Sequence, residues 1–503
     1  MNPADPAAPR LTDLSNCDRE PIHTPGSIQP HGFMLVLDPS GWKITGASTN
    51  ARDYFWREAT SLIGSDVAGL FGPEFPKQLE AARTQPDFTQ RAVLVGTHPI
   101  DGAGGLFTLV AHANGERVIV EGEKAADQRV QQVEQSLQAF LGRLAVTESP
   151  DEIHRLAVRE IRRITGFDRC LLYQFDADWN GTVIAEDRNQ ELPSYLHQRF
   201  PASDIPRQAR DLYLRNRVRL IPSNTYTPVP VLLQNGARSA GALDLSLSVL
   251  RGVSPIHLEY MRNMGTGSSM SVAVMRGGEL WGLLSCHSRA VRHIPFAIRT
   301  ECDLVGQFLS LQLAVREQNR ELGYRMELSG LLTRLLAGMA KGKDPLAAAD
   351  GEDLLRLGSS PGVAIVSDGQ VIRHGRTPGE AEVRNLAAWF GAQGKPIAFW
   401  DSLAAARPGE TPPAAAGLLA VRLREQPPAS ILWFRPEIIE VVEWGGEPRK
   451  AIEAHGEGHA LHPRKSFETW RETVRGRAKP WEPVVLSVTR EFREAVRAII
   501  LQV

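Results

Sequence analysis

The chain has 503 residues, and a typical domain length of ~150 residues predicts about three domains. It carries 57 Lys and Arg against 58 Asp and Glu, so no basic excess indicates nucleic acid or an anionic membrane as a partner. Residues 1–9 lack the pattern of a signal peptide, and no apolar run reaches the length of a membrane span. We therefore expect a cytoplasmic protein of ordinary globular composition.

The four cysteines, Cys17, Cys170, Cys286 and Cys302, are too scattered for a disulfide framework or a zinc site. Cys170 and Cys286 lie in apolar runs typical of strands, which predicts buried and inert thiols. Cys17 lies in a polar segment, where packing gives no reason for a thiol. It is either an incidental surface cysteine or a reactive one.

The N-terminal part of the sequence predicts a flexible arm followed by a small α+β domain. Residues 1–20 are rich in Pro, Ala and Asp, a composition typical of disorder. Residues 20–32 hold three prolines and two glycines, so we expect an extended, stiff crossing segment there. Two hairpins follow, at residues 33–37 with 42–47 and at residues 106–111 with 117–121.

The next part predicts a long helix and a second α+β domain. Apolar residues in the range 127–146 alternate at spacings of three and four, like a heptad seam. The expected elements after it are a helix at 153–164, strands at 170–175 and 182–186, and a closing hairpin at 271–275 and 280–287. Strand alternation in that hairpin places Trp281, Leu283, Ser285 and His287 on one face.

The octapeptide 199–206, Arg-Phe-Pro-Ala-Ser-Asp-Ile-Pro, places an acidic side chain between two prolines. Pro206 suits the first position of a helix predicted at 207–214, and Pro201 stiffens the approach to it. The carbonyl and carboxylate of Asp204 would then be held in a fixed direction, which suits a ligand with several N–H donors and a positive charge. The alternative is a helix N-terminus that a nearby acidic residue stabilises.

The C-terminal part predicts a helical spine and a third α+β domain at 345–440. A second apolar seam runs from Leu304 to Leu322 and could continue to about residue 340. It indicates either a helix shared between domains or protomers, or a surface helix packed on its own domain. The other expected elements are strands at 363–366, 371–373, 418–423 and 430–434, and a helix at 484–501.

An excursion follows the third domain. Its two arms, Trp444-Gly445-Gly446 and Pro463-Arg464-Lys465-Ser466-Phe467, flank a polar tip at 454–459. It is either a segment that reaches beyond its own domain or an ordinary surface hairpin.

No phosphate-binding loop, metalloprotease, nucleophile-elbow or kinase signature occurs in the sequence, so we expect no enzyme activity within these residues. Several separated motifs instead resemble the bacteriophytochromes, red/far-red photoreceptors with PAS, GAF and PHY domains. The motifs that carry this resemblance are Cys17 with Glu20-Pro21-Ile22-His23 and Ile28-Gln29-Pro30-His31-Gly32, Pro201 to Pro206, Ser254 to Tyr260, Ser285-Cys286-His287, and the two arms of the excursion.

The resemblance implies an α+β fold of three domains, each an antiparallel sheet with flanking helices, joined by long helices. The implied boundaries are an arm at 1–20, PAS at 21–125, GAF at 126–316 and PHY at 317–503, with a tongue at about 440–475 that reaches back to the GAF domain. The resemblance also implies a homodimer through the helices between GAF and PHY. A histidine kinase or response regulator would be the output, and this chain contains no segment for it.

The cofactor that the resemblance implies is biliverdin IX alpha. Relatives with a different bilin attach it to a cysteine directly before the histidine equivalent to His257. That residue here is Ile256, which cannot form a thioether. The implied attachment site is therefore Cys17, whose thiolate would add to a vinyl group of ring A.

The resemblance also implies roles within a GAF chromophore pocket. The carbonyl of Asp204 and the imidazole of His257 would accept the pyrrole N–H groups, while Arg219 and Arg251 would bind the propionates. His287 would bind the carbonyl of the ring that rotates, inside an aromatic cavity formed by Tyr173, Phe200, Tyr213 and Tyr260. The implied chromophore-binding residues are Asp204, Ile205, Pro206, His257, His287, Tyr173, Phe200, Tyr213, Tyr260, Arg219, Arg251, Ser254, Ser269 and Ser271. Without the resemblance, the aromatic residues would be read as core and the arginines as surface charge.

A two-state switch follows from the same resemblance. Light would isomerise the bond between rings C and D, and Asp204 would exchange a contact with Arg464 for one with Ser466 as the tongue refolds. The implied tongue residues are Trp444, Gly445, Gly446, Pro463, Arg464 and Ser466. A GAF-type small-ligand sensor and a dimerisation scaffold are the competing functions.

Overall fold

The computed structural model describes most of the chain, in two compact units, Met1–Ala314 with Glu443–Trp470 and Val315–Val442 with Arg471–Val503. The described residues are 20–125, 130–234, 243–342, 344–407, 412–447, 452–455, 458–461 and 467–500.

The first domain is an antiparallel sheet with the strand order β1-β11-β3-β2-β6-β5-β4. Alternate residues of β2 face opposite sides, because strand side chains have a period of two. Phe33 and Leu35 pack against the short helices, while Met34 and Val36 pack against residues contributed by the second domain. The elements are β1 Ser27–Ile28, β2 Gly32–Asp38, β3 Lys43–Ser48, α1 Ala51–Phe55, α2 Ala59–Leu62, α3 Ala68–Phe71, α4 Phe75–Arg83, β4 Val93–Pro99, β5 Leu106–Asn114, β6 Arg117–Lys124 and β11 Val229–Leu233. Both predicted hairpins, β2–β3 and β5–β6, are present.

The segment 23–29, which includes the strand β1, passes between residues 229–233 and residues 245–250 of the chain that continues from the second domain. On one side Val231 N donates to Gly26 O at 3.1 Å; on the other, Leu245 N donates to His23 O at 2.7 Å and Gln29 N to Leu250 O at 2.8 Å. The predicted crossing is confirmed here, but the segment is not extended throughout, because residues 22–23 and 30–31 form turns and only Ser27–Ile28 form a strand. The backbone bonds on both sides tie the first domain to the domain that follows.

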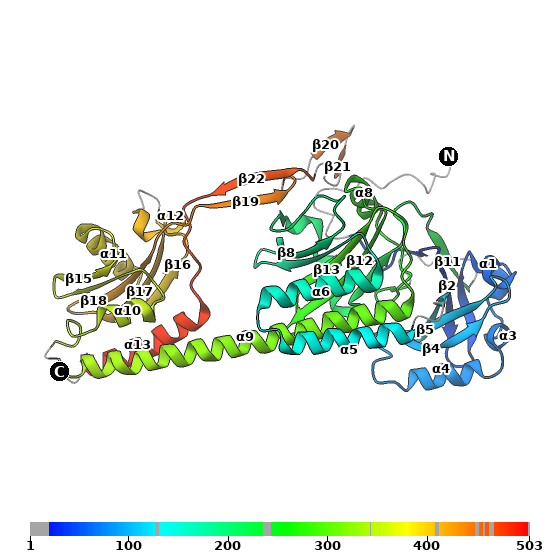
Figure 1. Ribbon diagram of the computed structural model, residues 1–503, viewed down its shortest axis with the longest axis horizontal. Coiled ribbons are helices and arrows are strands. Elements are labelled where there is room, and N and C mark those ends of the chain that lie inside the picture. Colours follow the sequence, from blue (N-terminus) through cyan, green and yellow to red (C-terminus); the bar gives the residue numbers. More distant parts are fainter. Residues whose placement is uncertain are drawn as a thin grey trace. The chain divides into compact units, whose positions relative to one another are not determined.

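The second domain has the strand order β10-β12-β13-β7-β8-β9-β19-β22. One face of this sheet packs on α5, α6 and the first part of α9 (Figure 1), through residues such as Phe140, Ile153 and Val305. The predicted closing hairpin turns at Gly277 and Gly278, both with positive φ. The elements are α5 Val130–Val146, α6 Pro150–Thr165, β7 Arg169–Phe175, β8 Gly181–Arg188, β9 Arg199–Phe200, α7 Arg207–Arg215, β10 Val218–Ile221, α8 Pro255–Asn263, β12 Ser268–Arg276, β13 Glu279–Ser288, α9 Phe296–Met339, β19 Glu440–Gly445 and β22 Thr469–Val474.

A β-bulge in this hairpin corrects one prediction. Val274 pairs with Gly282, but Met275 pairs with Leu280, so Trp281 is the extra residue. Such a residue breaks the alternation of side chains along its strand. Trp281 therefore packs in the cluster beneath the helices, with Cys286, rather than on the face of His287, and the predicted shared face was wrong at this position.

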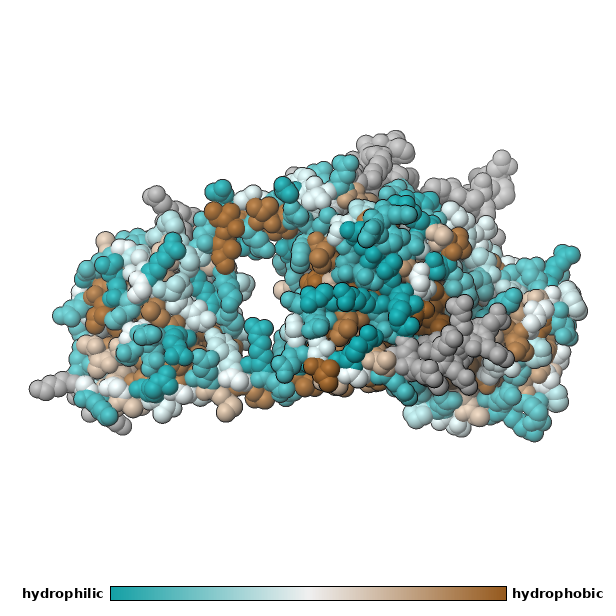
Figure 2. Space-filling view, viewed as in Figure 1, coloured by the Kyte–Doolittle hydropathy of each residue, from teal (hydrophilic) through white to brown (hydrophobic). Residues whose placement is uncertain are grey.

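The third domain is a sheet with the order β15-β14-β18-β17-β16. Asp368 and Gly369 both have positive φ in the turn between β14 and β15. Figure 2 shows apolar side chains gathered on the surface where β19 begins, and the exposed residues there are Ile438, Ile439 and Val441. The elements are α10 Gly351–Leu357, β14 Gly362–Ser367, β15 Gln370–Gly375, α11 Glu380–Ala392, β16 Ile397–Trp400, α12 Leu403–Ala406, β17 Gly417–Arg424, β18 Ala429–Arg435 and α13 Pro483–Ile500; the pair β20 Ile452–His455 and β21 Gly458–Leu461 lies between the tongue arms.

The long helix α9 carries two apolar stripes. Val305 and Leu309 are fully buried against the second domain. Leu311, Val315 and Leu322, which belong to the predicted seam, are 58%, 44% and 53% exposed. Packing within the described part of the chain therefore does not account for the apolar residues at these three positions of the seam. No helix in that part is long and apolar enough to cross a membrane.

Candidate functional site

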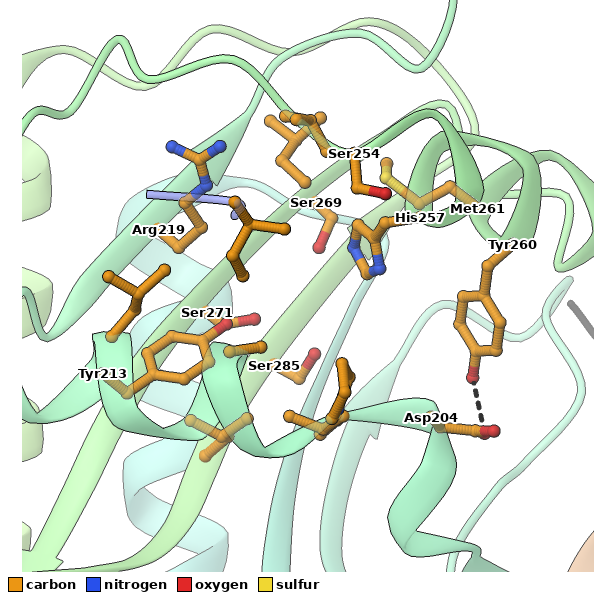
Figure 3. Close-up of a pocket in the computed structure, with 18 of the residues that line it drawn as sticks. Asp204, Tyr213, Arg219, Ser254, His257, Tyr260, Met261, Ser269, Ser271 and Ser285 are labelled. Atoms are coloured by element: carbon orange, nitrogen blue, oxygen red, sulfur yellow. Dashed lines mark hydrogen bonds between the residues drawn. The ribbon is translucent and has the colours of Figure 1, made fainter. Parts of the chain in front are cut away.

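A cavity of about 250 Å³ lies on the face of the second sheet that the helices α5 and α6 do not cover. One water needs only roughly 10–15 Å³ of such a volume, so the cavity has room for a much larger ligand. Its walls come from β7, β12, β13, α7, α8 and the loop before α8 (Figure 3). All fourteen residues that the resemblance assigned to a chromophore pocket line this cavity: Asp204, Ile205, Pro206, His257, His287, Tyr173, Phe200, Tyr213, Tyr260, Arg219, Arg251, Ser254, Ser269 and Ser271.

Two guanidinium groups define one end of the cavity. Arg219 donates to the carbonyls of Arg251 and Gly252, at 2.7 and 3.0 Å, and Arg251 donates to those of Leu245 and Ser246. Neither arginine forms an ion pair with a carboxylate among the described residues. Burial lowers the pKa of both, and repulsion by Arg219 helps to lower the pKa of Arg251 to about 9. Buried cations without anionic partners are costly, so this end of the cavity favours carboxylates on a ligand.

Tyr213 and the β12 serines lie at this same end. The Tyr213 hydroxyl bonds Ser271, and burial raises its pKa. Figure 3 shows Tyr213 and Ser271 on the side of Arg219, with Ser269 nearer His257. The resemblance had grouped Tyr213 with the aromatic residues of the opposite end, so the structure places this side chain differently from that expectation.

His257 occupies the middle of the cavity. Burial, together with the charge of Arg219, lowers its pKa to about 4, so the imidazole is neutral at physiological pH. It projects from the first turn of α8, which begins at Pro255 after Ser254. A neutral imidazole offers one donor and one acceptor, whereas its charged form would offer donors alone. The position therefore suits a ligand N–H group.

Aromatic side chains enclose the other end. The ring centroids of Tyr173 and Phe200 are 6.0 Å apart, and those of Tyr195 and Phe200 are 5.7 Å apart. An added Cβ at Gly181 would lie 1.8 Å from the Tyr173 ring, so only glycine leaves that ring in place. His287 reaches the cavity from β13 between these residues and Ser285. This end suits a largely apolar ring with a polar edge.

Asp204 lies at the C-terminal end of the short helix Ala202–Asp204, which Ile205 and Pro206 separate from α7. The Tyr260 hydroxyl donates to its Oδ2 at 3.0 Å (Figure 3). Pro206 caps α7, which begins at Arg207, so the prediction of Pro206 as the first helical residue was wrong by one position. Its φ of −63° nevertheless fits the constraint of the ring, with the extended ψ of a cap.

The arms of the tongue lie against this part of the second domain. Trp444 pairs in parallel with Arg199, whose guanidinium lies 5.3 Å from the Trp444 ring centroid. Gly445 packs on the Phe200 ring so closely that an added Cβ would lie 2.6 Å from it, and Gly446 has a φ of 108°. On the other arm, Phe467 contacts the Tyr260 ring edge-on at 5.2 Å. The predicted residues Cys17, Pro463, Arg464 and Ser466 lie outside the described residues.

Sequence reasoning missed several residues at this site. Tyr195 lies in an irregular segment with no recognisable motif. Arg169 is the first residue of β7, and because it is charged, its sequence position alone predicts an exposed side chain rather than the buried one that the structure has. Phe467 was part of the tongue motif, but nothing in the sequence indicated its contact with Tyr260. Leu171, Met261 and Met264 line the cavity as well and were not predicted. Ser203 and Ser285 belonged to the quoted motifs, but no role in the site was assigned to them.

A separate cluster lies outside the cavity, where His31, Glu123 and His293 bring potential ligand atoms within 4.8 Å of one another. Arg299 already donates to both oxygens of Glu123 at 2.7 Å each. The guanidinium supplies the positive charge that a metal ion would supply, so we interpret the cluster as an ion pair between the first two domains rather than a metal site.

The fold and the cavity define a chain of three α+β domains, the second of which has a cavity that suits a ligand with carboxylates at one end and an apolar ring at the other. Family models match the described domains: a PAS fold at residues 17–125, a GAF domain at 149–316 and the phytochrome region PHY at 328–503. Among curated relatives, cyanobacterial phytochrome B from Nostoc sp. is 35% identical over 100% of this chain and 68% of its own length. A bacteriophytochrome from Pseudomonas aeruginosa is 34% identical over 95% of this chain and 66% of its own length.

Solved structures agree with these matches. A bacteriophytochrome from R. palustris gives a TM-score of 0.85 at 36% identity, covering 97% of this chain and 99% of that one. The photosensory core module of a Stigmatella aurantiaca phytochrome gives 0.82 at 38% identity, covering 98% and 100%. The chain belongs to the phytochrome family of red/far-red photoreceptors, with the PAS-GAF-PHY arrangement of a bacteriophytochrome. It spans about two thirds of the length of the curated relatives it matches.

Proposed function

We propose that this chain senses light through biliverdin IX alpha, held in the cavity of the GAF domain and attached to Cys17. The observation that supports this best is the pair Arg219 and Arg251, whose guanidinium groups donate to backbone carbonyls and have no carboxylate partner among the described residues. Biliverdin carries two propionates, which suit two such cations. A neutral His257 and an aromatic end to the cavity complete the fit.

Each group of pocket residues would have its own task. Arg219 and Arg251 would hold the propionates, with Ser269 and Ser271 as further hydrogen-bond partners. The carbonyl of Asp204 and the imidazole of His257 would accept the pyrrole N–H groups. His287 would donate to the carbonyl of the terminal ring, beside the aromatic side chains of Tyr173, Phe200 and Tyr260. Tyr213 would instead act at the propionate end, beside Ser271. The remaining proposed contacts with the ligand are Ile205, Pro206 and Ser254, which also line the cavity.

When bound, the bilin would supply a light-driven isomerisation of the bond between its rings C and D. The response of the protein would begin at His287, which loses its ligand bond, and continue through the aromatic side chains beside it. Asp204 would then exchange partners on the tongue, Arg464 in one state and Ser466 in the other. The contact of Phe467 with Tyr260, whose hydroxyl bonds Asp204, supports a tongue that responds to this carboxylate.

We further propose an assembly and a division of the chain. The exposed stripe of Leu311, Val315 and Leu322 on α9 supports a homodimer through the helices between GAF and PHY. The proposed limits are a chromophore-bearing arm at 1–20, PAS at 21–125, GAF at 126–316, and PHY at 317–503 with its tongue at about 440–475. Signals would pass to a histidine kinase or response regulator in the cytoplasm.

The test is to co-express the chain with a haem oxygenase and purify it. A coloured protein with a reversible spectral change between red and far-red light is expected. A colourless protein would contradict the proposal and favour a non-photosensory ligand sensor or scaffold. The spectrum after prolonged darkness would identify the resting state.

Cys17→Ser tests the attachment site on a zinc-stained denaturing gel, which detects covalently bound bilin. The pigment band should disappear in Cys17→Ser and persist in the matched control Cys302→Ser, because Cys302 is fully buried beneath the sheet. A full-strength band in Cys17→Ser would exclude that attachment.

Asp204→His tests the proposed exchange of tongue contacts. This variant should retain pigment but photoconvert incompletely, with raised fluorescence. Complete reversible conversion would show that Asp204 does not relay the signal to the tongue.

A further inference from the structure

Arg169 lies at the start of β7, directly opposite His287 in the register of β7 with β13. It is only 3% exposed, and it forms no ion pair with a carboxylate among the described residues. A guanidinium buried without an anionic partner is costly, so its position calls for an explanation.

Three contacts hold this guanidinium in place. Its Nη1 donates to Pro193 O at 3.1 Å, and its plane lies over the Tyr195 ring, 3.9 Å from the centroid. Its Nη2 lies 3.4 Å from Nδ1 of His287. The contacts with Pro193 and Tyr195 hold the guanidinium in the orientation that directs Nη2 toward His287.

The chemistry of the two side chains decides which nitrogen of His287 carries the proton. A guanidinium can only donate hydrogen bonds and stays protonated at any pH the protein survives. Nδ1 of His287 therefore acts as the acceptor, and the ring proton lies on Nε2. Nε2 is 3.2 Å from Oγ of Ser285, another residue of the cavity wall, which can accept from it.

Burial and this same neighbour, Arg169, both keep the ring neutral. Burial, and then the charge of Arg169, hold the pKa of His287 well below its ordinary value. An imidazolium would have to donate from Nδ1 toward a group that has no lone pair to offer. His287 is thus restricted to one tautomer of one charge state.

We propose that Arg169 is a positioning residue that fixes His287 as an Nε2–H donor toward the cavity. It thereby selects a carbonyl oxygen, rather than an N–H or hydroxyl donor, on the ligand ring bound at this end. The identity of that ring as the terminal lactam of a bilin rests on the proposed function. The tautomer of His287 does not, because it follows from protein groups alone.

The competing explanation is that Arg169 only anchors the segment of Pro193 and Tyr195. Arg188 provides a matched control, because its Nη1 donates to the carbonyls of Asn189 and Leu192, at 3.1 and 2.6 Å, in the same segment. Arg188 makes no contact with His287 among its described hydrogen bonds. Arg188→Met should therefore loosen the segment without altering the imidazole.

The decisive measurement is ¹⁵N NMR of the full chain labelled at histidine, without pigment, with His287→Gln to assign the resonances. The wild type and Arg188→Met should show an unprotonated Nδ1 and a protonated Nε2. Arg169→Met should lose this single pattern and show a mixture of tautomers or a titrating ring. Arg169→Lys, which keeps a donor, should restore part of the wild-type pattern.

A protonated Nδ1 in the wild type would overturn the proposal, as would an unchanged pattern in Arg169→Met. If Arg169→Met fails to fold, the proposal is still tested by the tautomer of His287 in the wild type and by the pattern of Arg169→Lys. In pigment-loaded protein, Arg169→Met should shift the absorption maximum and lower the yield of photoproduct, whereas Arg188→Met should not. Absence of pigment binding in the wild type would refute the proposed function and leave the NMR result for Arg169 standing.

Discussion

Replacing Arg299 by Met should open the junction between the first two domains. Arg299 and Glu123 are each 4% exposed at the side chain and share two hydrogen bonds of 2.7 Å. His293 Nε2 lies 3.3 Å from the same carboxylate. Removing the guanidinium leaves a buried carboxylate with a weaker partner. Breaking a buried ion pair from one side costs roughly 3–5 kcal/mol.

Hydrogen exchange of β6, Arg117–Lys124, followed by mass spectrometry, measures this loss locally. Since 1.4 kcal/mol is tenfold in an equilibrium constant, its amides should exchange roughly 100-fold to a few thousand-fold faster. The double variant Glu123→Gln with Arg299→Met should recover much of the protection, because no unpaired charge remains.

Lys77→Met is the matched control, because the pair Lys77–Glu74 has a similar length, 3.0 Å, but is 76% and 70% exposed. An exposed pair contributes about 1 kcal/mol at most, so exchange in its helix should rise no more than about fivefold. Equal effects of Arg299→Met and Lys77→Met, each measured in its own segment, would refute the reasoning from burial.

Three further outcomes are expected. Gly445→Ala should displace the tongue arm, because its Cβ would lie 2.6 Å from the Phe200 ring; faster exchange of β19 amides would report this, and unchanged exchange would contradict it. In the proposed two-state switch, Tyr260→Phe removes the bond to Asp204 that the β-strand form of the tongue has, worth about 1 kcal/mol. The ratio of the two forms in the dark should then shift about fivefold away from the β-strand form, as measured by circular dichroism, and an unchanged spectrum would contradict this. Burial alone would raise the pKa of Glu123, but Arg299 and His293 hold it well below its ordinary value of 4.5. The stability it contributes is therefore complete above about pH 4.5 and lost as the pH falls, so wild-type β6 should open in acid while the double variant responds less.

Local signals in the sequence predicted most of the elements. The short gaps between the predicted strands 271–275 and 280–287, and between 363–366 and 371–373, hold the pairs Gly277-Gly278 and Asp368-Gly369. Both residues of each pair have positive φ, as tight hairpin turns need, and both hairpins are present. Helical periodicity gave α5 and α9, and the prolines of residues 20–32 gave the extended crossing segment. These features depend on neighbours within a few residues, which is why a single sequence reveals them.

Features set by distant residues could not be predicted in the same way. The bulge at Trp281 depends on how β12 and β13 pair, and no residue type in the strand signals it. The strand β11 lies far along the chain but joins the sheet of the first domain, because residues 23–29 pass beside it. The gathering of the pocket residues was expected from the family resemblance alone, since aromatic and arginine positions this far apart look like core and surface in isolation.

The two-residue strand β9 connects the wall of the cavity directly with the tongue. Phe200 turns toward the cavity and packs on Gly445, while its neighbour Arg199 pairs with Trp444 through the backbone. Adjacent residues of a strand face opposite ways, so one peptide unit connects the ligand wall with the docked arm. A displacement of Phe200 large enough to move β9 must also disturb the packing or the pairing of β19. A rearrangement at the aromatic end of the cavity therefore needs no long chain of intermediates to reach the tongue.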